Sequence, residues 1–405
     1  MFLFLTLDLG SIVMLDWLII GGGVHGTYLS HVLTSRAGVP RDRVRVLDPH
    51  PEPLARWRAR AENTGMAHLR SPDVHNIDLD PMSMLHFARC SEEAWSALFA
   101  GIYRNQPSLD FFQRHAAWVI HQHQLEKLRI VGCAEQMARY AEGFRIETGD
   151  GSLEARRVLL ALGPSEPYWP DWAQELRIQG APVHHIFDPG FARSALSTWT
   201  HAVIIGGGIT AMQTALALAQ RAPGTVTLLS RHALREHPFD SDPCWFSSCL
   251  AAYNREANLE RRRAVIRRAR HRGSIPPDIL QEIRSALTRA DLSMQPAEVQ
   301  SAYWRSDKRL MLAVNEDGRA ITTDCVILAT GFTQERPGGQ WLTQTIADLD
   351  LACSACGYPI VDRTLCWHPG LYVTGPLAEL EIGPVARNII GARLAAERIV
   401  AGARS

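Results

Sequence analysis

Residues 201–219, HAVIIGGGITAMQTALALA, decide the fold of this chain. An apolar segment runs into Gly206, Gly208 and Ala211, and small apolar residues with a helical pattern follow. In a dinucleotide-binding turn the first glycine makes the tight turn, the second lets the backbone approach a pyrophosphate, and the third position packs helix on strand. The stretch therefore predicts a pyrophosphate on the N–H groups of the first helical turn, which contains Thr210.

A second copy of this unit lies near the start of the chain. Residues 17–20, WLII, lead into Gly21, Gly23 and Gly26, and a helical pattern follows. One glycine motif alone is weak evidence, but two copies with the same strand and helix pattern predict two nucleotide sites in an α/β fold.

Each unit is followed by a matching strand pattern. Residues 158–163, VLLALG, and residues 326–331, VILATG, are buried-strand patterns that end in small-residue turns. We expect each strand to return beside its nucleotide sheet, where Gly163 and Gly331 allow close approach to a cofactor, in both cases FAD.

The end of the second strand of each unit predicts which nucleotide binds, because the residue there meets the adenosine ribose. Residues 44–47 end at Asp48, and a carboxylate that accepts from the ribose hydroxyls suits FAD or NAD. Residues 226–229 end at a serine and Arg231, whose guanidinium favours the 2′-phosphate of NADPH. An ordinary surface arginine is the alternative for Arg231.

The length of 405 residues suits two domains. We predict two Rossmann-like dinucleotide-binding domains, one for FAD and one for NADPH, with a discontinuous FAD domain. The expected segments are 14–165 for the first part of the FAD domain, 166–320 for the NADPH domain with a helical insertion at 239–292, and 321–405 for the second part of the FAD domain.

Three further residues are predicted to contact FAD. Arg70 follows the first unit, where a guanidinium would support pyrophosphate or flavin charge, and pairing with Asp73 or Asp78 is the alternative. Gly375 ends a predicted strand, and Pro384 opens the last predicted helix, whose start would face the flavin.

Apolar spacing also predicts local structure between the motifs. It indicates helices over 82–103 and 124–140, and a short strand at 118–120. The arginine-rich run 255–272 is interpreted as a solvated helix surface.

Composition argues against several classes of function. The 42 basic and 42 acidic residues balance, so no nucleic-acid partner is expected. The eight cysteines lack a framework spacing and the histidines lack ligand spacing around them, so we expect a reduced, cytoplasmic protein without a metal site. The apolar start is interrupted by Asp8 and has no basic n-region, which favours an extension, or translation from Met14, over a signal peptide or membrane span. A homo-oligomer is left open.

The motifs GGGVHG at 21–26, GGGITA at 206–211 and LATGF at 328–332 resemble those of the two-dinucleotide-fold flavoproteins, and within them the NADPH-dependent lysine and ornithine N-hydroxylases. The resemblance spans residues 16–400. It implies that NADPH reduces FAD, that reduced FAD and O₂ give a C4a-hydroperoxyflavin, and that a small nucleophile is oxygenated, most often an amine or amino acid. The catalytic residues are not identified by this resemblance.

Several alternatives remain open within this frame. Residues 178–188 are similar to a degraded copy of the Baeyer–Villiger fingerprint, which argues against ketone oxidation but leaves N-, S- and C-oxidation or halogenation open. The C-x-x-C pair Cys353 and Cys356 would suit a pyridine-nucleotide disulfide reductase, although it follows the LATGF turn rather than lying in a nucleotide unit. A non-catalytic NADPH sensor would retain both glycine turns.

Overall fold

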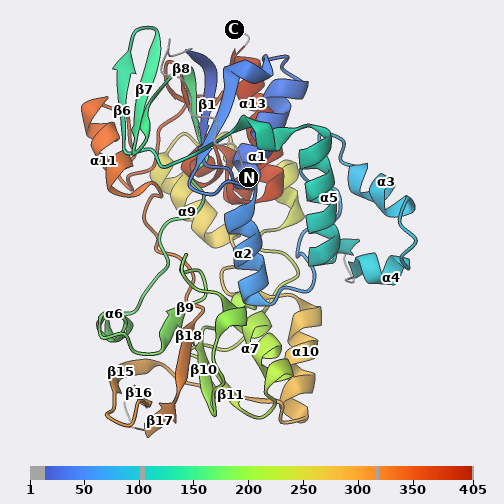
Figure 1. Ribbon diagram of the computed structural model, residues 1–405, viewed down its shortest axis with the longest axis vertical. Coiled ribbons are helices and arrows are strands. Elements are labelled where there is room, and N and C mark those ends of the chain that lie inside the picture. Colours follow the sequence, from blue (N-terminus) through green and yellow to red (C-terminus); the bar gives the residue numbers. More distant parts are fainter. Residues whose placement is uncertain (1–13, 101–104, 316–318, 404–405) are drawn as a thin grey trace, which may run out of the picture.

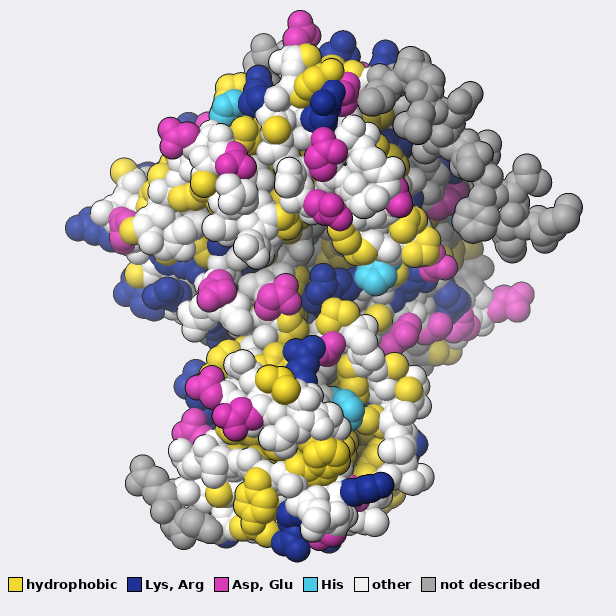
Figure 2. Space-filling view, turned by 60° about the vertical axis from the view of Figure 1, so that its left-hand side comes forward, with side chains coloured by type: hydrophobic (Ala, Val, Ile, Leu, Met, Phe, Trp, Pro, Cys, Tyr) yellow, Lys and Arg dark blue, Asp and Glu magenta, His cyan; other side chains and the backbone are white. Residues whose placement is uncertain are grey.

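The computed structural model describes residues 14–100, 105–315 and 319–403. The predicted extension before Met14 lies outside these residues. The chain forms two lobes, with both described ends of the chain in the upper one (Figure 1). The outline narrows between the lobes, so the molecule has a waist (Figure 2). Among the described residues, none of the helices has the length and apolar character needed to cross a membrane.

The upper lobe is built on a mixed sheet whose strands come from both ends of the chain. Its main path follows the order β19 (Cys366–His368), β20 (Leu371–Val373), β8 (Gly151–Leu160), β1 (Leu15–Ile20), β2 (Val44–Asp48) and β5 (Arg129–Val131). All neighbours on this path are parallel except β19 and β20. An antiparallel meander of β6 (Gln136–Tyr140) and β7 (Gly143–Thr148) joins β8. Strand order therefore reverses between β1 and β8, which is where such sheets bind ligands.

Helices bury the faces of this sheet. The helix α1 (Val24–Ser35) packs beside α13 (Ile389–Ala403), so the two ends of the chain share one core (Figure 1). Other elements of this lobe are α2 (Ala55–Thr64), α3 (Ser83–Arg89), α4 (Trp95–Leu98), β3 (Phe99–Ala100), β4 (Gln106–Pro107), α5 (Leu109–Gln122), α11 (Gly339–Asp348) and α12 (Glu379–Ile382). The discontinuous upper lobe agrees with the predicted fold class.

The lower lobe is a parallel sheet covered on both faces. Its order is β14 (Leu292–Pro296), β11 (Val226–Ser230), β10 (Ala202–Ile205), β18 (Cys325–Leu328) and β9 (Val183–His185). The helices α7 (Ile209–Arg221) and α10 (Pro277–Thr288) cover one face. The other face packs against α6 (Asp171–Ile178) and the antiparallel strands β15 (Val299–Trp304), β16 (Leu310–Val314) and β17 (Arg319–Thr323). Alternate side chains of β10 and β18 enter the two cores, as strand geometry requires.

The strand β18 corrects one predicted boundary. We assigned 321–405 to the FAD domain, but β18 pairs with β10 and β9 in the lower sheet. The antiparallel strands β15 to β17 carry the chain out and back, so β18 closes the lower sheet before the chain returns to the upper lobe.

Three local predictions differ from the structure. Residues 118–120 lie inside α5, whose buried residues Phe111, His115 and Val119 recur every four positions. This helical period overrides the strand preference of an aromatic and two β-branched residues. Residues 124–140 form a short 3-10 turn and the strands β5 and β6 instead of a helix. The predicted helix over 82–103 is broken into α3 and α4, and residues 101–104 lie outside the described part.

The predicted helical insertion reaches across to the upper lobe. It contains α8 (Ser248–Tyr253), α9 (Leu259–Ala269) and the short strand β13 (Ser274–Ile275), which pairs with β12 (Arg235–Glu236). The helices α9 and α12 are in contact, and the Tyr253 hydroxyl donates to the carbonyl of Leu380 at 2.9 Å. The same insertion ends in α10, which belongs to the lower lobe.

The waist is closely packed where α2 meets α7. A Cβ on Gly65 would lie only 2.5 Å from the Cβ of Ala217, so no larger residue fits there. The Asn63 amide donates to the carbonyl of Phe191 at 2.7 Å, and the Arg193 guanidinium donates to the Asn63 carbonyl at 3.0 Å. These contacts fix the lower lobe against α2.

Four histidines that are buried or partly buried make stability depend on pH. Burial lowers the pKa of His25, His31, His115 and His185 from 6.5 to about 4, so each is neutral in the folded chain at pH 7. The unfolded chain binds these protons below its pKa of 6.5. The free energy of unfolding should therefore be highest above that pH and fall as the pH drops to about 4, by about 1.4 kcal/mol per group and pH unit.

Urea unfolding at pH 7.5 and pH 5.0 measures this difference. His115→Gln, which removes one buried imidazole, should reduce the difference, whereas His86→Gln at an exposed position should leave it unchanged. Equal free energies of unfolding at both pH values would contradict the prediction.

Candidate dinucleotide sites

The first glycine turn lies where strand order reverses in the upper sheet. Gly21 follows β1 with φ +108°, and a Cβ there would overlap the carbonyl oxygen of Ala161 at the end of β8. A Cβ on Gly26 would overlap the carbonyl oxygen of Gly21. These two positions therefore require glycine for packing within the chain, as the motif predicts.

Gly23 differs from its neighbours because it faces open space. No atom lies within 4 Å of the place where its Cβ would be. It is the N-cap of α1, which has no side-chain cap and no acidic residue in its first turn. The turn therefore offers an open approach to uncapped N–H groups at the positive end of a helix, which suits a pyrophosphate.

Asp48 ends β2 as predicted, but it is already surrounded by donors. Its carboxylate accepts from the backbone N–H of Gly22 at 2.6 Å and of His50 at 2.9 Å. The Arg129 guanidinium lies 3.1 Å from the same carboxylate, and both side chains are largely buried. Asp48 therefore fixes the turn and positions Arg129.

Arg129 is a site residue that the motif analysis missed. Its Nε and Nη1 are buried without a hydrogen-bond partner, and Nη1 lies against Gly22. A buried guanidinium that pairs with Asp48 but keeps two nitrogens without a partner beside an anion-binding turn fits a group that carries ribose hydroxyls and phosphates. These residues thus fit FAD, which Gly23, α1 and Arg129 would hold. The sequence did not indicate Arg129, because residues 124–140 were predicted to be helical, whereas Arg129 begins β5 beside β2.

His25 connects the first turn of α1 to the C-terminal segment, and sequence reasoning missed it as well. Its Nδ1 lies 2.8 Å from the Thr374 hydroxyl, and its Nε2 lies 3.1 Å from the Asn388 carbonyl. Because the ring is neutral, Nε2–H donates to Asn388 and Nδ1 accepts from Thr374. Gly375 follows at φ +64° against the His25 ring. The C-terminal segment is thereby placed at the glycine turn.

Pro384 also lies in this C-terminal segment. It begins a short 3-10 helix, Pro384–Arg387, which precedes α13 rather than opening it. Gly163 follows β8 with φ +77° and with open space at its Cβ position, as expected for close approach. Gly331 follows β18, which returns beside the second nucleotide unit in the lower sheet as predicted, and the contact of Gly331 with FAD stays a prediction.

Arg70 lies at the seam between the lobes. Its guanidinium donates to the carbonyls of His237 at 2.6 Å and Pro238 at 2.9 Å, and to the Ser274 hydroxyl at 2.9 Å. The three acceptors belong to the segments around β12 and β13. Arg70 thus anchors these segments to the upper lobe, and its contact with FAD stays a prediction.

The second glycine turn repeats the first in the lower sheet. Gly206 follows β10 with φ +154°, and a Cβ there would lie 2.6 Å from the carbonyl oxygen of Ala329 after β18. Gly208 is the N-cap of α7, which has neither a side-chain cap nor an acidic first turn. Ala211 is fully buried against the sheet, and Thr210 lies half-buried in the first turn. This turn fits a second pyrophosphate in the same way.

Two features surround the second turn. Arg231 follows β11 as predicted, is exposed, and lies 3.2 Å from Glu298. A Cβ on Gly208 would lie 3.1 Å from the Cα of Gly273, so the segment before β13 passes directly over the turn. The insertion therefore covers the second nucleotide site, which the sequence did not indicate.

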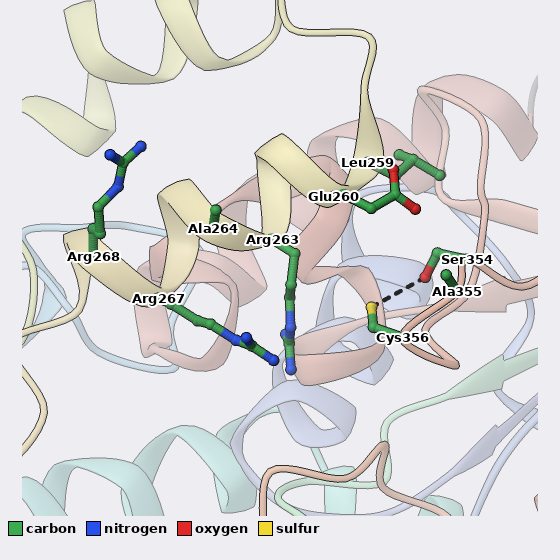
Figure 3. A pocket seen from close by; sticks show the side chains of 9 residues that line it. All are labelled: Leu259, Glu260, Arg263, Ala264, Arg267, Arg268, Ser354, Ala355 and Cys356. Carbon is green, nitrogen blue, oxygen red and sulfur yellow. Dashed lines mark hydrogen bonds between the residues drawn. The ribbon is translucent and has the colours of Figure 1, made fainter.

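A cavity of about 620 Å³ lies between α9 and the loop around Ser354 (Figure 3). Arg263 and Arg267 point into this space, and the Cys356 sulfur faces α9 (Figure 3). The interpretation of the arginine run as a solvated surface was wrong for Arg263, which is buried and paired with Glu379. Burial of that carboxylate makes a close cation necessary.

The cysteines give limited support to a redox role. Cys353 and Cys356 are free thiols, and burial raises the pKa of Cys353, which disfavours the reactive thiolate. Cys356 shares a hydrogen bond with the Ser354 hydroxyl at 3.2 Å. The structure instead contains a disulfide between Cys244 and Cys249, which the spacing had not predicted.

Gly23→Ala tests the first turn. The added methyl group meets no atom of the protein but occupies the approach to the N–H groups of α1, so we expect normal folding and at least about tenfold weaker FAD binding. The ratio of bound flavin to protein and the circular dichroism spectrum measure the two effects. Gly190→Ala is the control, because that glycine also has room for a Cβ and lies in the lower lobe. Full flavin content in Gly23→Ala would refute this site.

Comparison with known proteins supports this architecture. Residues 18–165 match the model of a FAD-NAD(P)-binding domain, and residues 124–395 match the model of the pyridine nucleotide-disulphide oxidoreductase family. No curated protein sequence matches the chain.

Solved structures with the same fold include three amine-hydroxylating enzymes. The ornithine hydroxylase PvdA of Pseudomonas aeruginosa superposes with a TM-score of 0.75 at 18% identity, over 96% of this chain and 98% of that chain. The cadaverine monooxygenase DfoA of Erwinia amylovora gives 0.73 at 16% identity, over 96% and 95%. The L-lysine 6-monooxygenase of Pseudomonas syringae gives 0.71 at 18% identity, over 96% and 99%.

These structures share the two-lobed fold along nearly the whole chain, which confirms the predicted fold class of two dinucleotide-binding domains. The family match covers more than half of the sequence. The chain therefore belongs to the pyridine nucleotide-disulphide oxidoreductase family.

Proposed function

We propose that this chain is an FAD- and NADPH-dependent monooxygenase that hydroxylates the nitrogen of a small amine or amino acid. One observation carries the proposal: both glycine turns are intact at the reversal points of two sheets, in a fold shared along 96% of the chain with ornithine and cadaverine hydroxylases. These two enzymes are only 16–18% identical to this chain in sequence, so the substrate must be found by experiment.

Each lobe binds one of the two cofactors. Gly23, the start of α1 and Arg129 hold FAD in the upper lobe, and Gly208, the start of α7 and Arg231 hold NADPH in the lower lobe. When bound, FAD supplies hydride acceptance and O₂ activation, which no side chain provides. The protein's part is to hold the two cofactors in fixed relation and to exclude water between them.

The contacts at the waist support this positioning role. The packing of Gly65 on Ala217 and the Asn63 hydrogen bonds hold the lobes together. Arg70 ties the segments over the second turn to the upper lobe. We infer that the reacting groups meet at this seam, with a small molecule and O₂ as the other partners. A cytoplasmic location and the oligomeric state stay predictions.

The proposed activity is tested with the purified, flavin-loaded protein and NADPH. We expect ornithine, lysine or cadaverine to accelerate NADPH oxidation and O₂ uptake, and to yield a product that has gained one oxygen atom, identified by mass spectrometry. NADPH oxidation that yields only hydrogen peroxide with every amine, but an oxygenated product with a sulfide or an electron-rich ring, would favour C- or S-oxygenation. A brominated ring product formed with added bromide would favour the halogenase. A purified protein that contains no flavin and does not oxidise NADPH would favour the non-catalytic NADPH sensor.

The disulfide reductase alternative makes a different prediction. It requires two new thiols after NADPH addition, and loss of activity in the double variant of Cys353→Ser and Cys356→Ser. We expect no new thiols and unchanged amine hydroxylation in that variant, because the two cysteines are already free.

Arg231→Ala tests the choice of NADPH. A guanidinium on the 2′-phosphate contributes a charge-assisted hydrogen bond, so its loss should raise KM for NADPH by about tenfold or more and leave KM for NADH unchanged. Arg289→Ala is the matched control, because Arg289 is also exposed, paired with one carboxylate and located in the lower lobe. Equal changes in KM for NADPH and for NADH would show that Arg231 does not contact the 2′-phosphate.

A further inference from the structure

Two histidines and an aspartate meet at the seam between the lobes, outside both glycine turns. The Nε2 atoms of His237 and His271 lie 3.3 Å and 3.4 Å from the same carboxylate oxygen, Oδ1 of Asp242. The imidazole rings stack with centroids 3.5 Å apart and planes 21° apart, so a shared ion requires the two rings to rotate until their lone pairs converge. All three ligand atoms lie within 4.8 Å of one another. His237 and Asp242 come from the segment before α8, and His271 comes from the segment after α9.

The hydrogen bonds of His237 bear on which tautomer its imidazole ring adopts. Its Nδ1 lies 2.8 Å from the Phe239 carbonyl, and this is shorter than its 3.3 Å contact with the Phe239 nitrogen. In the tautomer that donates Nδ1–H to this carbonyl, Nε2 carries the lone pair and can bind a metal. A lone pair and a carboxylate oxygen that face each other can share one bound cation. A carbonyl that receives Nδ1–H is also the usual support of a metal-binding histidine.

The distances favour a metal ion over a shared proton. Charge-assisted N–H···O hydrogen bonds are about 2.7–2.9 Å long, shorter than both contacts to Asp242. Ligands at about 2.0–2.2 Å from a tetrahedral Zn²⁺ are separated by about 3.3–3.5 Å. The two separations of 3.3 Å and 3.4 Å fall in that range.

We propose that His237, Asp242 and His271 bind a divalent transition metal of the Zn²⁺ class. Two neutral imidazoles and one carboxylate are a ligand set that such ions prefer, and three protein ligands leave the fourth position for water. The side chains are 27%, 50% and 28% exposed, so an ion has access from solvent. Two nearby cations have partners of their own: Arg270 pairs through Nη2 with Asp240, and Arg70 donates to carbonyls and to Ser274.

The site joins the two segments that cover the second glycine turn. His271 is two residues from Gly273, which lies over Gly208, and His237 follows β12, which pairs with β13. A bound ion fixes these segments to each other through Asp242. This proposal differs from our expectation of a chain without a metal site, and it is independent of the proposed oxygenation.

Metal binding is measured on the tag-free full chain after dialysis against a chelator. Titration with Zn²⁺ should show one equivalent by calorimetry, and Co²⁺ should give the visible absorption of a tetrahedral site. His237→Ala, His271→Ala and Asp242→Asn should each weaken Zn²⁺ binding by at least about tenfold. Circular dichroism without metal verifies that each variant folds.

His86→Ala is the matched control, because His86 is exposed and lies 3.3 Å from one carboxylate, that of Asp80. This variant should leave Zn²⁺ binding unchanged. A second histidine cluster, His31, Asp78 and His123, provides the decisive alternative. If the chain binds no Zn²⁺, or if His31→Ala abolishes binding while His271→Ala does not, the proposed site is wrong.

Discussion

Both glycine turns depend on one steric constraint. At each turn, the backbone after one strand lies so close to a carbonyl oxygen after the neighbouring strand that no side chain fits between them. Gly21 lies against Ala161, and Gly206 lies against Ala329, each at the point where strand order reverses. This approach aims the start of a helix at the carboxyl edge of its sheet. The helices α1 and α7 then present uncapped N–H groups to the same edge. Both cofactor sites follow from this arrangement of backbone alone.

Side chains then specialise the two turns in different ways. In the upper lobe, the buried pair of Asp48 and Arg129 costs desolvation but fixes a guanidinium whose Nε and Nη1 have no partner beside the turn. In the lower lobe, the exposed Arg231 follows the corresponding strand and pairs with Glu298. Under the proposed function, the first site is preorganised for a resident cofactor, whereas the accessible charge of Arg231 suits a nucleotide that enters and leaves.

Local motifs were predictable from the sequence, and long-range contacts were not. The glycine turns and strand ends depend on a few adjacent residues, so their pattern is visible in the chain. The His25 contact with Thr374 joins residues 349 positions apart, and no local pattern encodes it. The same is true of Gly273 over Gly208. Where local signals conflicted, as at residues 118–120, burial at a helical period decided the outcome. Gly132 at φ +157° helps to explain why 124–140 is not a continuous helix.

The path of the insertion has a consequence for modularity. The chain leaves the lower sheet after β11, docks α8 and α9 on the upper lobe, and returns to form α10 and β14. Arg262 pairs with Glu381 at 2.7 Å within that docking surface, and Arg263 pairs with Glu379. The lower lobe is consequently not an independent unit that recombination can exchange as one piece. Any new lower lobe must also bring an insertion whose arginines match the acidic residues of α12, so the two halves are constrained to evolve together.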